Sequence, residues 1–321
     1  MDNALIQMLP SVLLEGLLLG CVYAMIALGY TMVYGVLGLI NFAHSEVFMI
    51  GAVAGVEVLR YLGPHTDHAW VLLAAALVGD GTVAGLIAVA MERLAYRPLR
   101  RRGSTNRMVP LITAIGVSFF LQDFVRLVEG LWHNEFYLDY PSLPALDHTF
   151  TLPMDTMVQT KSIVVMVVAL LMMTGLFVLV QKTRLGKAIR AVAQDLPTAS
   201  LMGINPDRII SRTFLIGGFL GGVAGVLFGL LYTQVNPFVG FIPGVKAFTA
   251  AVLGGIGSIP GAMLGGLLLG VLETAAAFYL PLMTEGTIGP EYKDIFSFVV
   301  LVVLLLVRPQ GLLGRPQREK V

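Results

Sequence analysis

Asn41, His44 and Glu46 place three polar side chains at a junction between two long apolar stretches of the sequence. Such groups are costly inside a bilayer unless they are paired or in contact with water. One interpretation is that they line a path through the protein at a helix break, with Glu46 near the positive end of a helix dipole. The alternative is that Asn41 or Ser45 caps the second helix and that Glu46 supports this cap.

Isolated charges in other apolar stretches are further candidates for a polar path. Lys246 stands alone in an apolar neighbourhood, and Asp80 and Glu273 each lie inside another apolar segment. Charged residues inside membrane segments often mark substrate or ion pathways. Lys246 could instead extend to the membrane surface or form an ion pair. The candidate path residues are Tyr30, Asn41, His44, Glu46, Lys246 and Glu273.

The segment 182–208 is basic, long and patterned like an amphipathic helix. Its apolar residues recur at helical spacing between Ala188 and Leu196, and Pro197 and Gly203 interrupt the pattern. A helix of this kind binds either lipid headgroups or a soluble partner. The interrupted shape favours the docking of a partner, because a simple lipid anchor does not need it.

Residue spacing argues against several kinds of catalytic or cofactor site. No GxxxxGK[ST] motif is present, so this chain does not bind ATP through a P-loop. The glycines that follow Lys246 lie between apolar segments, which argues against a dinucleotide site. The five histidines lack metal-site spacing, and a single cysteine, Cys21, forms neither a disulfide nor a cysteine metal site within the chain. We therefore expect no catalytic residue, cofactor or metal in this chain.

The composition indicates the scaffold that must position these residues. Of 321 residues, 56% are hydrophobic and 13% are charged, whereas soluble domains have about 45–50% and about 25%. This balance excludes an ordinary soluble enzyme, a disordered protein and a nucleic-acid binder with a basic face. No apolar segment alternates with period two, which disfavours a membrane β-barrel. We predict an all-α polytopic membrane protein with a single transmembrane domain over 1–321.

Nine apolar segments approach the length of about 20 residues that a membrane-spanning helix needs. They are 11–37, 46–63, 69–92, 108–130, 161–181, 209–233, 240–258, 261–281 and 294–308. The first is too long and glycine-rich for one straight helix, and glycine and proline also crowd 236–261, so we expect broken helices there. Because 240–258 could be re-entrant, the predicted number of spans is about eight to nine.

The distribution of lysine and arginine predicts the orientation. These residues gather in 93–107, in 182–212 and in the C-terminal tail, whereas 131–160 contains acidic residues and neither lysine nor arginine. By the positive-inside rule, 93–107, 182–208 and the C-terminus are cytoplasmic, and 131–160 is an extracytoplasmic loop. Three spans before 93–107 place the N-terminus outside.

Several long motifs carry a resemblance to a known family. They are GYTMVYGVLGLINFAHSEVFMIG (Gly29–Gly51), ERLAYRPLR (Glu92–Arg100), Gly203-Ile204-Asn205, KAFTAAVLGGIGSIPGAMLGG (Lys246–Gly266) and RPQGLLGRP (Arg308–Pro316). With these motifs, essentially the whole chain resembles the LivH-type permease of bacterial branched-chain amino-acid ABC transporters. Ser45 departs from the family pattern, which usually has glycine at this position.

The resemblance implies a multi-pass permease of the bacterial inner membrane that pairs with a second permease of the LivM type. Two cytoplasmic ATPase subunits, which bind ATP and Mg²⁺, and an extracytoplasmic substrate-binding protein would complete an importer of leucine, isoleucine and valine. The segment 182–208 would be the coupling loop that contacts the ATPases. Its residues comparable to the family's coupling pattern are Ala193, Asp195, Ala199 and Gly203.

Other functions remain as alternatives. Relatives in this family also carry urea, short amides or other amino acids. An ion-coupled secondary transporter could use Asp80, Glu273 and His44 as ion sites, although it would not need the interrupted helix of 182–208. An integral-membrane enzyme is disfavoured, because no set of nucleophile, base and acid is recognisable at one depth.

Overall fold

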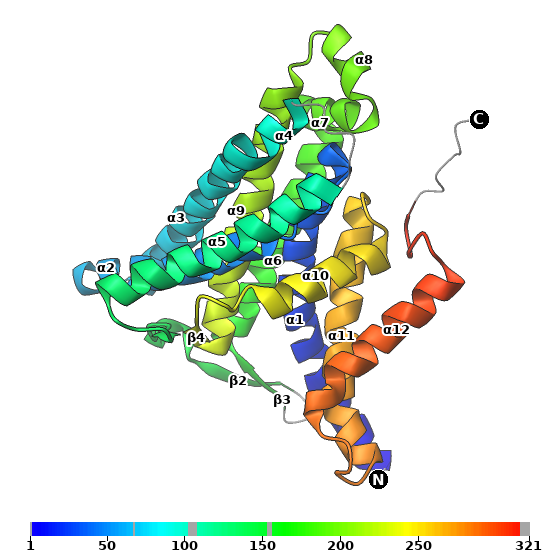
Figure 1. Ribbon diagram of the computed structural model, residues 1–321. Helices are drawn as coiled ribbons and strands as arrows, with labels where there is room; N and C mark the ends of the chain where they lie inside the picture. The colour runs from blue at the N-terminus through cyan, green and yellow to red at the C-terminus, as the bar shows by residue number, and fades with distance from the viewer. Residues whose placement is uncertain (1, 67, 102–107, 153–155, 315–321) are drawn as a thin grey trace.

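The computed structural model describes residues 2–66, 68–101, 108–152 and 156–314 (Figure 1). Within these ranges, seven helices are long and apolar enough to cross a membrane. They are α1 (Asp2–Leu37), α2 (His44–Leu62), α3 (Ala69–Met91), α5 (Met108–Trp132), α6 (Thr160–Lys182), α9 (Pro206–Tyr232) and α11 (Ile259–Met283). The predicted helical membrane fold is confirmed.

Two further apolar segments form shorter helices, α10 (Phe241–Gly254) with 14 residues and α12 (Lys293–Val307) with 15. At a rise of 1.5 Å per residue, each is about 21–23 Å long, less than the ~30 Å of the hydrocarbon core. Gly255 and Gly257, with φ of 105° and 88°, end α10 and turn the chain into α11. The break predicted within 236–261 is therefore present, and the helices agree with about eight to nine spans.

The helix α1 continues through the glycine-rich run in which we expected a break. A Cβ atom on Gly16 would lie 2.7 Å from the Cα of Val271, and one on Gly20 would lie 2.8 Å from the Cα of Leu267. These glycines let the backbones of α1 and α11 approach, as small residues do in membrane helix pairs. The helix ends at Leu37, and Gly38, with φ of 66°, begins the turn into α2.

The centre of the bundle is formed by α1 and α9, which are the most deeply buried spans. α9 packs along α3, α2 and α1, and α1 packs along α11. By contrast, α5 and α6 leave most of their surface uncovered. Most exposed side chains of α5 are apolar, with Asp123 and Arg126 as charged exceptions, so this helix faces either lipid or another protein.

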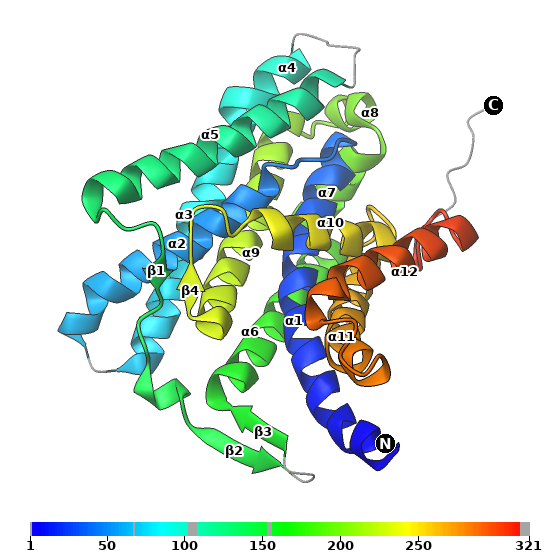
Figure 2. The same cartoon turned by 60° about the horizontal axis from the view of Figure 1, so that its bottom comes forward.

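The two ends of the bundle carry different structural elements (Figures 1 and 2). One end carries a π-helical turn (Glu92–Tyr96), α4 (Arg97–Arg101), α7 (Arg184–Gln194) and α8 (Leu196–Leu201). At the other end, β2 (Thr149–Leu152) and β3 (Thr156–Gln159) form an antiparallel hairpin, and β1 (Leu138–Asp139) pairs with β4 (Gln234–Val235). Short 3-10 turns occur at Gly63–His65, Pro144–Leu146 and Pro290–Tyr292. The described parts of the basic segments 93–107 and 182–208 thus lie at the end opposite to the described part of the acidic 131–160 loop, and the basic residues of 102–107 and 315–321 lie outside the described residues.

Candidate functional site

The turn between α1 and α2 brings Asn41, His44 and Glu46 into the bundle, where all three are buried. Asn41 Oδ1 accepts hydrogen bonds from the backbone N–H of Ala43, at 3.1 Å, and from the hydroxyl of Tyr96, at 2.6 Å. Ala43 is the N-cap residue of α2 and makes no side-chain cap bond. Asn41 therefore shapes the turn before the helix and ties it to the π-helical turn after α3.

Glu46 lies in the first turn of α2, but its carboxylate contacts α5 and does not support a cap. Its Oε1 accepts hydrogen bonds from Ser118 Oγ and Gln122 Nε2, both at 2.9 Å, and lies 3.0 Å from Ser45 Oγ. Ser118 and Gln122 are four residues apart and share one face of α5. Among the described residues, Oε2 has no hydrogen-bond partner. Neutral donors therefore hold this buried carboxylate.

A cavity of about 700 Å³ lies beside these donors. Its apolar and aromatic wall is formed by Tyr30, Phe42, Ile115, Phe119, Phe238, Phe241, Ile242 and Val245, and its polar part by Ser45, Ser118 and Gln122. Small-molecule sites typically have volumes of about 300–1,000 Å³ and mostly apolar walls. The groups that hold Glu46 are thus the polar strip of a cavity suited to a small, partly apolar molecule.

Tyr30 reaches this cavity, whereas His44 packs behind it. The two rings meet edge-on, with centroids 5.0 Å apart and an interplanar angle of 69°. The imidazole of His44 fills the space over Gly29 in α1, where a Cβ atom would collide with it, and a Cβ on Gly221 in α9 would lie 3.6 Å from its Nε2. His44 therefore packs between α1 and α9. Of the predicted path residues, Tyr30 alone lines the cavity.

Lys246 and Glu273 form an ion pair between α10 and α11, with 2.7 Å between Nζ and Oε1. Lys246 Nζ also lies 2.8 Å from Asp294 Oδ1, and Lys293 Nζ lies 3.2 Å from Glu273 Oε1. Tyr23 of α1 donates a hydrogen bond to Glu273 Oε2 at 3.0 Å. The ion-pair interpretation of Lys246 is confirmed. Neither Lys246 nor Glu273 lines the cavity; with Tyr23 and the residues of α12 they join four helices.

The predicted coupling residues lie at the basic end, in and around α7 and α8. Asp195 caps α8, because its carboxylate accepts hydrogen bonds from the backbone N–H of Thr198, at 3.1 Å, and from its hydroxyl, at 2.8 Å. Ala193 and Gly203 are exposed, and Gly203, with φ of 82°, turns the chain towards α9. Asp195 and Gly203 thus give the segment the compact shape that the sequence indicated.

The exposed apolar surface of this segment differs from the predicted one. Ala199 is only 3% exposed and packs inward, so it is not available for a surface contact. Leu201 and Met202 instead expose 87% and 78% of their surface. Both were missed from the sequence, although two large apolar residues directly before Gly203 were a visible signal.

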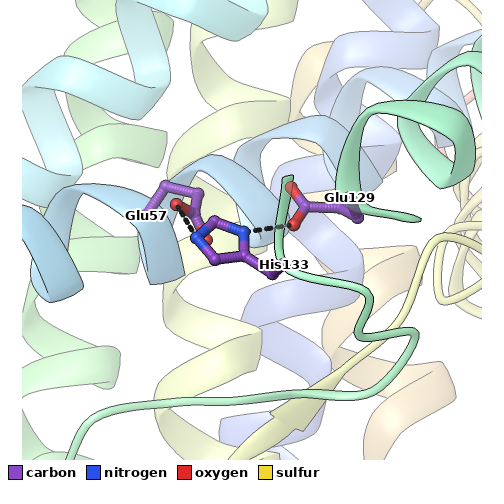
Figure 3. Close-up of side chains that lie close together, drawn as sticks. All are labelled: Glu57, Glu129 and His133. Atoms are coloured by element: carbon purple, nitrogen blue, oxygen red, sulfur yellow. Dashed lines mark hydrogen bonds and ion pairs between the residues drawn. The ribbon is translucent and has the colours of Figure 1, made fainter. Parts of the chain in front are cut away.

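Glu57, Glu129 and His133 form a cluster where α2 and α5 end (Figure 3). His133 Nδ1 lies 3.3 Å from Glu129 Oε2, and Nε2 lies 3.7 Å from Glu57 Oε2. Three potential metal-ligand atoms lie within 4.8 Å of one another. The histidine spacing did not reveal this trio, because Glu57 belongs to a distant helix. Arg60 lies 3.7 Å from Glu57 within α2 and 2.9 Å from Glu135, which follows α5, so Arg60 also ties the two helix ends together.

Tyr140 anchors the 131–160 loop in the bundle. Its ring packs against Gly229 of α9 and its hydroxyl lies against Gly55 of α2, where a Cβ atom would collide with it. Asp80 of α3 lies nearby, fully buried, and neither its oxygens nor the Tyr140 hydroxyl has a hydrogen-bond partner among the described residues. Burial, and then the charge of Asp80, raise the pKa of Tyr140 well above its usual value. The phenol therefore stays neutral at physiological pH.

Comparisons with known proteins agree with this architecture. Residues 12–305 match the family described as "Branched-chain amino acid transport system / permease component". The permease protein LivH of the high-affinity branched-chain amino acid transport system of Escherichia coli K12 is 46% identical over 310 residues, 96% of each chain. LivM of the same organism is 28% identical and covers 92% of this chain and 69% of the relative.

A solved structure supports the fold alone. PsaBC from Streptococcus pneumoniae in complex with Fab aligns with a TM-score of 0.54 and 13% identity, over 97% of both chains. The family match extends from the first span to α12. The chain belongs to the family of branched-chain amino acid transport system permease components.

Proposed function

We propose that this protein is the permease subunit of an ATP-binding-cassette importer that moves branched-chain amino acids across the cytoplasmic membrane of a bacterium. The observation that carries this proposal is the cavity of about 700 Å³, in a chain that is 46% identical to a branched-chain amino acid permease. Leucine, isoleucine and valine combine an apolar side chain with a charged end. The aromatic and aliphatic wall suits the side chain, and Ser45, Ser118 and Gln122 suit the charged end.

The exposure of the cavity wall supports a partner permease. Phe119, Phe241 and Ile242 line the cavity, yet they expose 62%, 62% and 59% of their surface. A cavity that takes a charged amino acid cannot open onto the hydrocarbon of the membrane, because an unpaired charge is costly there. A second permease of the LivM type, packed against α5 and α10, would cover these three side chains and enclose the substrate between the two subunits.

The basic end of the bundle supports coupling to ATPase subunits. In this proposal α4, α7 and α8 face the cytoplasm, and Leu201 and Met202 insert into a groove on an ATPase subunit that binds ATP and Mg²⁺. α7 packs against α1, α6 and α9, so a displacement of α8 reaches α1, which carries Tyr30 on the cavity wall. The substrate-binding protein would dock at the opposite end, on the 131–160 loop.

Uptake by the reconstituted transporter tests the substrate. Vesicles that contain both permeases and the ATPases should accumulate radiolabelled leucine when ATP and the loaded binding protein are supplied. Unlabelled isoleucine and valine should compete, and urea or acetamide should not. Gln122→Leu should lower uptake at least tenfold, whereas Phe124→Ala, on an exposed face of α5 outside the cavity, should lower it less than twofold. Competition by urea alone, or uptake driven by an ion gradient without ATP, would refute the proposal.

A second experiment tests the coupling surface. Leu201→Glu puts a charge where an apolar contact is proposed, so leucine-stimulated ATP hydrolysis should fall by a factor of ten or more. Leu201→Met keeps the contact apolar and should retain the stimulation. If Lys187→Gln abolishes stimulation and Leu201→Glu does not, the segment binds lipid headgroups and the coupling surface lies elsewhere.

A further inference from the structure

Two cavities meet on the surface formed by α3, α6 and α9, away from the proposed substrate cavity. The first, of about 480 Å³, is lined by Leu86, Val89, Arg93, Arg97, Arg101, Asn205, Asp207, Arg208, Ser211, Arg212 and Leu215. The second, of about 370 Å³, is lined by Thr82, Leu171, Met172, Gly175, Leu176, Leu179, Leu215, Ile216, Phe219 and Leu220. Leu215 belongs to both linings, so a basic cavity continues into an apolar one.

The arginines of the basic cavity exceed the acidic groups that neutralise them. Arg97 and Arg100 contact both Glu92 and Asp207, and Arg101 contacts Asp207. The three other arginines nearby are exposed, and no carboxylate lies within ion-pair distance of them among the residues that the structure describes. They are Arg93, Arg208 and Arg212. The cavity therefore presents guanidinium groups that are free to bind an anion.

The polar and apolar parts follow one face of each helix. On α9, Arg208, Arg212, Leu215 and Phe219 recur at intervals of four, three and four residues, which places them on one side of a helix. From Arg212 to Phe219 the helix rises about 10 Å. The two cavities together form one groove, which runs from the basic end of the bundle into its apolar part. Leu86 and Leu171 along it expose 62% and 66% of their surface.

We propose that this groove binds one anionic phospholipid, with the headgroup phosphate on Arg93, Arg208 and Arg212 and one acyl chain in the apolar cavity. Arginine pairs with phosphate through two parallel hydrogen bonds, and basic pockets between membrane helices on the cytoplasmic side bind anionic lipid headgroups. A free phosphate would use the arginines alone and would leave the adjoining apolar cavity without a role. The phospholipid accounts for both parts and for their continuity at Leu215.

Native mass spectrometry of the assembled transporter, with both permeases and the ATPases, tests this site. The complex is given equal amounts of phosphatidylglycerol and phosphatidylcholine with identical acyl chains. The wild type should retain one phosphatidylglycerol in preference to phosphatidylcholine. The double variant Arg93→Gln/Arg212→Gln should lose this preference by roughly thirtyfold. The matched control is Lys182→Gln/Arg184→Gln, which removes the same charge at the same end but outside both cavities, and it should keep the preference.

A variant in the apolar cavity separates a lipid from a free anion. Gly175→Leu fills space there, because a Cβ on Gly175 meets no atom within 4 Å, and it leaves every arginine in place. Retention of phosphatidylglycerol should fall at least fivefold, while thermal unfolding of the complex stays unchanged. Unchanged retention in Gly175→Leu, together with displacement by millimolar inorganic phosphate, would make the arginines a simple anion site. Absence of any preference in the assembled wild type, even if the isolated permease shows one, would mean that another protein covers the groove. Either result overturns the proposal.

Discussion

Glu46 and Glu273 are both buried carboxylates, at 0% and 1% exposure, but the bundle holds them in different ways. Glu46 accepts hydrogen bonds at one oxygen from neutral groups on α5, and its other oxygen has no hydrogen-bond partner among the described residues. Glu273 uses both oxygens, one towards the Tyr23 hydroxyl and the other towards Lys246 and Lys293. The first site borders a cavity, and the second joins helices.

This difference indicates which parts of the bundle can move. Breaking a buried ion pair costs about 3–5 kcal/mol, whereas a single hydrogen bond from a neutral donor to a charged group contributes about 1.5–3 kcal/mol. Contacts between α2 and α5 at Glu46 are therefore cheaper to rearrange than those among α1, α10, α11 and α12 at Glu273. Val245 lines the cavity and Lys246 joins the ion-pair network, so the network anchors one wall while α5 forms the adaptable wall.

The largest expected effect is on the ion-pair network. Glu273→Leu leaves the buried Lys246 with Asp294 alone and should destabilise the protein by about 3–5 kcal/mol, measured as a lower thermal unfolding temperature of the purified complex. The double variant Lys246→Met/Glu273→Leu removes both buried charges and should recover at least half of this loss. If the double variant is as unstable as Glu273→Leu, the network does not act through its charges.

A smaller effect is expected at Glu46. Glu46→Leu leaves the donors of Ser118 and Gln122 unsatisfied, which should cost about 1–3 kcal/mol, and it should raise the KM for leucine because the polar strip loses its orientation. Glu46→Gln keeps an acceptor oxygen and should show less than half of either change. If Glu46→Leu lowers the unfolding temperature as much as Glu273→Leu does, the contacts at Glu46 are not cheaper to rearrange than those at Glu273.

The sequence predicted the scaffold better than the position of the polar groups. Apolar length predicted the helices, and the glycines and prolines of 236–261 predicted the break before α11, because these signals are local. The partners of Glu46 and Glu273 lie 72 and 27 residues away, and helix packing alone brings them together. The polar residues Ser118 and Gln122, four apart in an apolar span, were the local signal for the cavity that we missed.

α1 is a second case in which the local sequence did not reveal the packing of a distant helix. Its glycines were interpreted as helix breakers, whereas they allow close packing against α11. Glycine has both effects, since it lacks a Cβ atom, and only the neighbouring helix decides between them. Ala199 is a further example, because its place on the inner face of α8 depends on the capping bonds of Asp195 to Thr198.

A substitution at Ser45 tests the neutral hydrogen-bond donors around Glu46 with a smaller change. Its hydroxyl has one proton and two acceptors, Glu46 Oε1 at 3.0 Å and the Phe42 carbonyl at 2.8 Å. Ser45→Gly removes this hydroxyl and leaves Ser118 and Gln122 on Glu46. We expect the unfolding free energy to change by less than about 1 kcal/mol. Leucine uptake should fall less than it does in Gln122→Leu, because Ser118 and Gln122 remain in the polar strip. A loss of uptake as large as that of Gln122→Leu would assign Ser45, and not α5, the main role in the polar strip.

Tyr140 and Asp80 form a third buried site, with neither cations nor neutral donors on the carboxylate among the described residues. At pH 8, Tyr140→Phe should change the unfolding free energy by less than about 0.5 kcal/mol, because the phenol has no hydrogen bond to lose.

At alkaline pH the two proteins should differ. The pKa of Tyr140 is raised by burial and by the charge of Asp80, whereas an unfolded tyrosine titrates near pH ~10. As the pH rises, the unfolded state therefore loses the phenol proton before the folded state does. The unfolding free energy of the wild type keeps its full value below pH ~10 and falls above it by up to about 1.4 kcal/mol per pH unit. Tyr140→Phe lacks this loss and should be more stable than the wild type at pH 11, as measured by thermal unfolding at both pH values. If the stabilities of the two proteins change equally between pH 8 and pH 11, the loop does not hold the phenol inside the bundle.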